Sequence, residues 1–152
     1  MKRYYPQLIG IIVCLGLGFA SGFLTQDALS TWYKDLNTPS FNPPAYIFGP
    51  VWSCLYIMIG IAAGKLWSVR HQYPILWSLF LVQLVFNFAW TPLFFAMHRI
   101  DLALIDITLL WVTLALLMFK DRHERIVLFW LLPYFFWASF ATVLNISLYT
   151  LN

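Results

Sequence analysis

Five long apolar segments, separated by short charged connections, dominate this 152-residue chain. A membrane-spanning helix needs about 20 mainly apolar residues to cross roughly 30 Å of hydrocarbon. Hydrophobic residues make up 62% of the chain and charged residues 10%, whereas a soluble domain is about 25% charged. We therefore expect an all-α integral membrane bundle, one domain over residues 1–152, with five transmembrane helices. The expected spans are residues 5–25, 46–67, 74–97, 102–119 and 125–148.

The basic residues are concentrated in alternate connections. Short loops rich in Lys and Arg stay on the cytoplasmic side of a cell membrane. With a cytoplasmic N-terminus, seven basic residues lie inside and only Lys34 and Arg99 lie outside. The seven are Lys2, Arg3, Lys65, Arg70, Lys120, Arg122 and Arg125. This predicts a multi-pass protein of the cell membrane, with the first loop and the C-terminus outside.

The connection between the first two spans is rich in aromatic residues and proline, and we expect it to run from Trp32 to Trp52. Prolines fix φ and remove backbone donors, so such a connection is stiff. Asp27 and Ser30 are expected to mark its start. Its prolines are Pro39, Pro43, Pro44 and Pro50, and its aromatic residues are Trp32, Tyr33, Phe41, Tyr46, Phe48 and Trp52. A rigid aromatic lid at a membrane surface predicts capture of a flat, apolar ligand.

Polar and aromatic residues recur at helical spacing on four of the expected helices. Gln83, Asn87 and Trp90 share one face of the third helix, because positions three and four apart lie together. The corresponding stripes are Phe48, Trp52 and Tyr56 on the second helix, Asp106, Leu109 and Thr113 on the fourth, and Trp137, Ala141 and Leu144, with Asn145 beside them, on the fifth. Since unpaired polar groups are costly in hydrocarbon, the stripes predict a shared interior.

Each stripe also has a purely structural interpretation. Amides in membrane helices often join helices by hydrogen bonds, which accounts for Gln83 and Asn87 as well as a pocket does. Asp106 is close to Arg99 in the chain, and we expect a structural ion pair or hydrogen bond for it. The GxxxG patterns that begin at Gly18 and at Gly60 permit close helix packing, either in a dimer or within one bundle.

Conventional catalytic and metal-binding motifs are absent from the sequence. It contains no HExxH, no GxSxG, no phosphate-binding glycine loop and no Cys/His metal cluster. Cys14 and Cys54 lie in different spans and are expected to be inert packing residues. His71, His98 and His123 lie in the connections and are expected to be solvated. We therefore expect no metal site and no required cofactor, and the chain has no basic patch for nucleic acid.

Several of these segments together resemble the translocator protein family, also called tryptophan-rich sensory proteins or peripheral benzodiazepine receptors, and in particular its bacterial members. The resemblance extends from about Gly18 to Asn145. The resemblance rests on these motifs: WY at 32–33, PSFNPP at 39–44, the spaced Phe48, Trp52 and Tyr56, QLVFNFAWTPLFF at 83–95, and PYFFWASFATVLN at 133–145.

The resemblance implies a pocket beneath the first loop, usually in a homodimer. It further implies binding of porphyrins, including protoporphyrin IX, and of isoquinoline-carboxamide or benzodiazepine drugs. The matching ligand-binding positions are Tyr33, Pro43, Phe48, Trp52, Asn87, Trp90, Trp137, Ala141 and Leu144. Mammalian relatives also bind cholesterol through a tyrosine followed by a basic residue. Here no Lys or Arg follows Tyr149, which makes cholesterol a doubtful ligand.

Three functions stay open on the sequence. The first is binding of porphyrins and planar drugs within the membrane, where aromatic rings bury large flat surfaces. The second is light-dependent oxidative degradation of a bound porphyrin, with Trp52 and Trp137 as the catalytic residues. The third is transport of tetrapyrroles or related lipophilic molecules, which the odd number of spans weakens because it excludes two equal halves.

Overall fold

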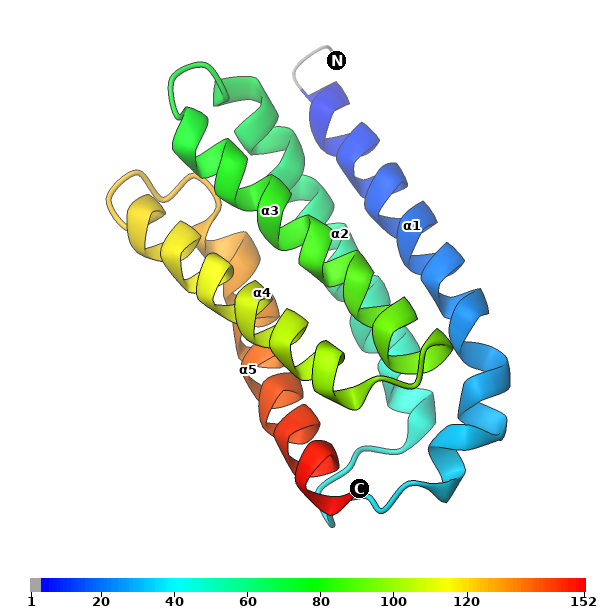
Figure 1. The fold of residues 1–152 in the computed structure, drawn as a ribbon. Coiled ribbons are helices and arrows are strands. Elements are labelled where there is room, and N and C mark those ends of the chain that lie inside the picture. The colour runs from blue at the N-terminus through cyan, green and yellow to red at the C-terminus, as the bar shows by residue number, and fades with distance from the viewer. Residues whose placement is uncertain (1–3) are drawn as a thin grey trace.

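The computed structural model describes residues 4–152, and over that range it contains helices and connections but no strand. Five helices are long and apolar enough to cross a membrane, which confirms the predicted all-α bundle. They are α1 (Tyr5–Ser30), α2 (Ala45–Val69), α3 (Pro74–Thr91), α4 (Ile100–Asp121) and α5 (Leu128–Leu151) (Figure 1). Two short helices complete the fold: the 3₁₀ helix η2 (Trp32–Asp35) and the π-helical η3 (Pro92–Ala96), which continues α3.

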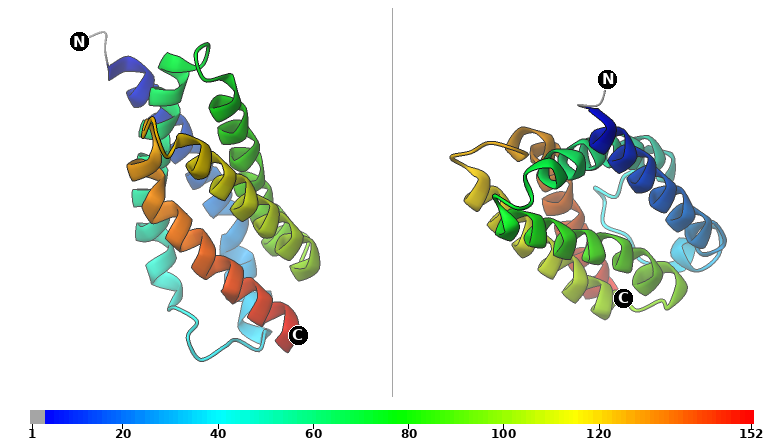
Figure 2. Two further views of the ribbon diagram at one scale, coloured as in Figure 1. Left: turned by 90° about the vertical axis from the view of Figure 1, so that its left-hand side faces the viewer. Right: turned by 90° about the horizontal axis from the view of Figure 1, so that it is seen from above.

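The helices run up and down, so the connections alternate between the two ends of the bundle. The described N-terminal end lies with the α2–α3 and α4–α5 connections, and the C-terminus lies at the opposite end with the α1–α2 connection (Figures 1 and 2). The basic residues of the α2–α3 and α4–α5 connections therefore lie at one end of the bundle, while Lys34 and Arg99 lie at the other. Lys2 and Arg3 fall outside the described residues.

The first connection is shorter than the sequence predicted. Helix α1 continues through Asp27 and Ser30, and the Ser30 hydroxyl donates to the Asp27 carbonyl oxygen at 2.9 Å inside the last turn. Helix α2 begins at Ala45 directly after Pro44. The expected end of the connection at Trp52 is therefore wrong, whereas the expected start of the second span at residue 46 is confirmed to within one residue. Pro50 lies inside α2, beyond its first turn, where it removes one helical hydrogen bond.

Glycines bring α1 and α2 into close contact along the first half of α1. A Cβ atom on Gly60 would collide with the backbone of Ile11, and one on Gly64 would collide with the backbone of Gln7. A Cβ atom on Gly18 would meet the ring of Tyr56. Small residues allow such close backbone approach in membranes. These glycines of the two GxxxG patterns therefore pack within one chain.

Candidate ligand-binding cavity

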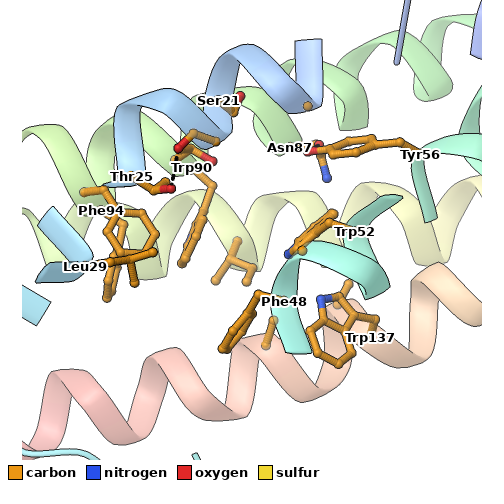
Figure 3. Close-up of a pocket in the computed structure, with 18 of the residues that line it drawn as sticks. Ser21, Thr25, Leu29, Phe48, Trp52, Tyr56, Asn87, Trp90, Phe94 and Trp137 are labelled. Atoms are coloured by element: carbon orange, nitrogen blue, oxygen red, sulfur yellow. Dashed lines mark hydrogen bonds between the residues drawn. The ribbon is translucent and has the colours of Figure 1, made fainter. Parts of the chain in front are cut away.

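An elongated cavity of about 420 Å³ lies inside the bundle, next to the first connection. Its size falls within the roughly 300–1,000 Å³ range of small-ligand pockets. Side chains from all five long helices line it, together with Tyr33 of η2 and Phe94 and Phe95 of η3. Helix α1 lies on one side of the space and α5 on the other (Figure 3). The walls are mainly apolar and aromatic.

The cavity brings together residues that lie far apart in the sequence. Eight of the nine residues predicted to bind ligand line it: Tyr33, Phe48, Trp52, Asn87, Trp90, Trp137, Ala141 and Leu144. The ninth, Pro43, is in the connection next to the start of α2 and is not among the lining residues. The stripes on α2 and α5 therefore face one common space with Asn87 and Trp90 of α3. Gln83 of the α3 stripe is not among the lining residues, and neither are Asp106, Leu109 and Thr113, the predicted stripe on α4.

Aromatic pairs hold the walls in place. The ring of Trp90 stacks on Phe94 with centroids 4.9 Å apart and an interplanar angle of 16°. Phe48 meets Trp137 edge-on at 6.0 Å, and Trp52 lies against Tyr56 at 5.3 Å. Offset and edge-on pairs of this kind stabilise a packed aromatic surface beyond simple burial. The π-helical turn at Pro92 places Phe94 beneath Trp90.

Two buried hydrogen-bonded groups fix the polar part of the wall. The Tyr56 hydroxyl donates to the Asn87 Oδ1 at 3.2 Å, and the Asn87 Nδ2 donates to the Tyr134 hydroxyl oxygen at 2.8 Å. The Trp90 Nε1 donates to the Asn145 Oδ1 at 2.9 Å. Asn87 therefore joins three helices and lines the cavity at the same time.

The indole N–H groups of Trp52 and Trp137 differ from that of Trp90. Within residues 4–152 neither indole nitrogen has a hydrogen-bond acceptor, and both residues line the cavity. Both indoles are held by aromatic contacts instead. Two unused donors in an apolar space can therefore bind an acceptor group on a ligand, because a buried polar group gains from being paired.

Residues 31–44, which we call the lid, are held by one hydrogen bond within the lid and by contacts to two other segments. The Tyr33 hydroxyl donates to the Asn42 Oδ1 at 3.2 Å. Trp32 stacks on His98 at 4.3 Å, so His98 packs against the lid although its own side chain is exposed. The backbone N–H of Asn37 donates to the Asn152 Oδ1 at 2.9 Å, and the Asn152 Nδ2 donates to the Asn37 carbonyl oxygen at 3.0 Å. The lid is therefore tied to the ends of both η3 and α5.

Burial raises the pKa of the Tyr33 phenol, while its hydrogen bond to Asn42 acts in the opposite direction. The hydroxyl consequently stays protonated at neutral pH. It remains a hydrogen-bond donor at the edge of the cavity, where the lid meets the bundle.

Asp106 does not have the partner that the sequence suggested. Arg99 instead binds Asp101, with its Nε 2.8 Å from Oδ1 and its Nη2 2.6 Å from Oδ2. Within residues 4–152 the buried Asp106 Oδ2 and both amide atoms of Gln83 have no hydrogen-bond partner. The expected ion pair or hydrogen bond of Asp106 is therefore wrong, because Asp101 is nearer to Arg99 at the exposed start of α4. The interhelical hydrogen bonding expected of the amides holds for Asn87 and not for Gln83.

Helix α1 supplies a wall that the sequence reasoning missed. Its lining residues include Phe19, Ser21, Gly22, Thr25 and Leu29. Ser21 and Thr25 lie four residues apart and share one helix face, and both line the cavity (Figure 3). That spacing of two hydroxyls in an apolar span was the available signal. It is weak, because a hydroxyl can be satisfied by its own helix, as Thr25 is by the Gly22 carbonyl oxygen at 2.7 Å.

The fold and the cavity define a multi-pass membrane protein with a tryptophan-lined cavity inside its helix bundle. The chain belongs to the TspO/MBR family, which it matches over residues 10–150. This confirms the resemblance drawn from the sequence motifs.

Relatives match along nearly the full chain. The chain is 36% identical to the tryptophan-rich protein TspO of Chlorobaculum tepidum, with 99% of this chain and 98% of that protein aligned. It is 36% identical to the tryptophan-rich sensory protein of Cereibacter sphaeroides, over 100% of this chain and 95% of that protein. It is also 31% identical to the human translocator protein, over 86% of this chain and 80% of that protein.

Proposed function

We propose that this protein binds porphyrins such as protoporphyrin IX within the membrane, and that the same cavity accepts isoquinoline-carboxamide and benzodiazepine-type drugs. The observation that carries the proposal is the set of aromatic side chains around one apolar space, with Trp52, Trp90 and Trp137 among its walls. Flat aromatic ligands gain both from burial and from ring contacts in such a space.

The polar groups near the cavity suit an acidic ligand with a large apolar body. The free N–H groups of Trp52 and Trp137 orient an acceptor inside the cavity. Lys34 is the only basic residue between positions 31 and 44, and it follows Tyr33 in η2. Its ammonium group is available to a porphyrin carboxylate at the edge of the lid, as a charge-assisted hydrogen bond.

The proposal is tested by quenching of tryptophan fluorescence with protoporphyrin IX. Phe in place of Trp52 or Trp137 retains a ring and removes an N–H donor. Loss of one hydrogen bond, about 1 kcal/mol, should weaken affinity about fivefold. Trp77→Phe is the matched control, because Trp77 packs on Phe80 and Trp67 outside the cavity lining. Unchanged affinity in both pocket variants would contradict the assignment.

Light-dependent degradation of the bound porphyrin is a second candidate, because both Trp52 and Trp137 face the space where the ligand would lie. The excited porphyrin would take an electron from an indole and pass it to molecular oxygen. Oxygen is thereby reduced to superoxide, and the oxidised indole recovers its electron from the porphyrin ring. The resulting porphyrin radical cation combines with superoxide, so the net change is the addition of O2 to the porphyrin and the indole is restored. Under illumination, the complex should form a discrete product, and variants of Trp52 or Trp137 that still bind should stop forming it. Equal bleaching of free porphyrin in detergent would argue against catalysis.

Transport of tetrapyrroles is the alternative to both, and flux of labelled porphyrin into reconstituted vesicles tests it. The wider proposal is a homodimer in the cell membrane, in contact with lipid and with the N-terminus in the cytoplasm. It has no required cofactor, no nucleic-acid partner and no metal, with protoporphyrin IX as ligand or substrate and cholesterol a doubtful ligand.

A further inference from the structure

One wall of the cavity is also part of the outer surface of the bundle. Phe19 and Gly22 of α1 and Ala45 and Gly49 of α2 all line the cavity, and all are exposed. The Phe19 side chain is 65% exposed. A residue that faces both the cavity and the outside lies at an opening. This opening is between two membrane-spanning helices, so it faces lipid.

The opening begins where the close packing of α1 and α2 stops. Gly64 meets Gln7, Gly60 meets Ile11 and Tyr56 meets Gly18, which describes one continuous antiparallel contact. Continuing the same register places Gly22 opposite the first turns of α2, where Gly49 lies. A Cβ atom on either of these two glycines would have no neighbouring heavy atom within 4 Å.

No hydrogen bond closes this gap within the described residues. The hydroxyl of Thr25 donates to the Gly22 carbonyl oxygen at 2.7 Å, and that of Ser53 donates to the Gly49 carbonyl oxygen at 2.9 Å. Each hydroxyl is thus satisfied inside its own helix. The second half of α1 is held instead by η2 and η3. Helix α1 is therefore held by contacts on both sides of the gap, whereas no hydrogen bond joins α1 to α2 at the gap itself.

We propose that Gly22 and Gly49 frame a lateral entrance through which flat apolar molecules reach the cavity from the bilayer, and that the absence of side chains at these two positions sets the width admitted. This inference rests on the proposed ligand binding. Apolar ligands are concentrated in the membrane because transfer from water is favourable. The route through the side requires no movement of the lid, which its contacts to His98 and Asn152 hold in place.

Stopped-flow quenching in lipid vesicles, with protoporphyrin IX added to the membrane, tests the entrance. Gly22→Leu and Gly49→Leu should each slow association by about tenfold, since binding is slower when access is obstructed. Dissociation should slow along with association, so the equilibrium affinity should change much less than either rate. Gly16→Leu is the matched control, because Gly16 is exposed on α1, has open space around its Cβ position and does not line the cavity.

A lid variant separates the two routes of access. Asn152→Ala removes both hydrogen bonds that its side chain makes to Asn37. A lateral entrance predicts an unchanged association rate in this variant, whereas access under the lid predicts a faster one. Wild-type association rates in both Gly22→Leu and Gly49→Leu would overturn the entrance while leaving ligand binding intact. Absence of saturable quenching in the wild-type protein would instead overturn the proposed function itself.

Discussion

The carboxylate of Asp121 lies fully buried at the end of α4 and accepts three backbone hydrogen bonds at the start of α5. Its Oδ2 accepts from the N–H groups of Val127 and Leu128, both at 2.8 Å, and its Oδ1 accepts from Ile126 at 3.0 Å. The first N–H groups of a helix have no partner within the helix, and a negative charge there also interacts well with the helix dipole. One side chain therefore joins two membrane helices.

We expect Asp121→Ala to lower the free energy of unfolding by about 3 kcal/mol, because several backbone donors lose a charged acceptor. Asp121→Asn keeps one carbonyl oxygen and should cost about 1–2 kcal/mol. Thermal unfolding in detergent, followed by circular dichroism, measures both. Asp27→Ala is the control, since Asp27 is exposed on α1, and it should stay within about 0.5 kcal/mol of the wild type. Wild-type stability of Asp121→Ala would refute the capping role.

For single residues, the sequence predicted the helix face on which a side chain lies better than it predicted the residue with which that side chain pairs. Asn87 and Trp90 were expected to face a common interior, and both do, because helical spacing is a local property. The partner of Arg99 was not predictable, because Asp101 and Asp106 are both near in sequence. Only the start of α4 at Ile100 decides which carboxylate the guanidinium reaches.

Among the helices, the pairing of α1 with α2 depends most on residue size. Gly60→Ala would put a methyl group against the backbone of Gly10 and Ile11, and a backbone cannot rotate away as a side chain can. We expect a loss of about 1–3 kcal/mol in stability, as overpacked cores show. Gly16→Ala, with open space at its Cβ position, should leave stability unchanged or raise it by up to about 1 kcal/mol through helix propensity. Unfolding of both variants in detergent measures the difference, and equal stability would contradict the close packing.

The starts of α1, α2 and α3 were predicted to within one residue, whereas the end of α1 and the bounds of α4 and α5 lie two to five residues from the prediction. Helix α1 continues to Ser30 because polar residues near a membrane surface are compatible with helix. Helix α2 starts at Ala45 because Pro43 and Pro44 disfavour a helix before them. The π-helical turn that begins at Pro92, and the placement of Phe94 below Trp90, depend on packing in the folded bundle.

For the molecule as a whole, the order of the basic residues in the sequence and the up-and-down fold together make the charge of the two ends of the bundle unequal. Basic residues of the α2–α3 and α4–α5 connections lie at one end of the bundle, and the lid with the C-terminus lies at the other. Because short basic loops are retained in the cytoplasm, this arrangement gives one expected orientation. The lid should then lie on the outer face of the cell membrane.

Labelling with a membrane-impermeant maleimide in intact cells tests that orientation. The background is a variant in which Cys14 and Cys54 are replaced by alanine, because these are the only two cysteines. Lys34→Cys, exposed in η2, should react in intact cells. Arg122→Cys, exposed between α4 and α5, should react only after the membrane is permeabilised. The reverse pattern would place the lid in the cytoplasm, and equal labelling of both variants would indicate a mixed orientation. Either result would contradict the charge argument, because the charge asymmetry between the two ends should select one direction of insertion.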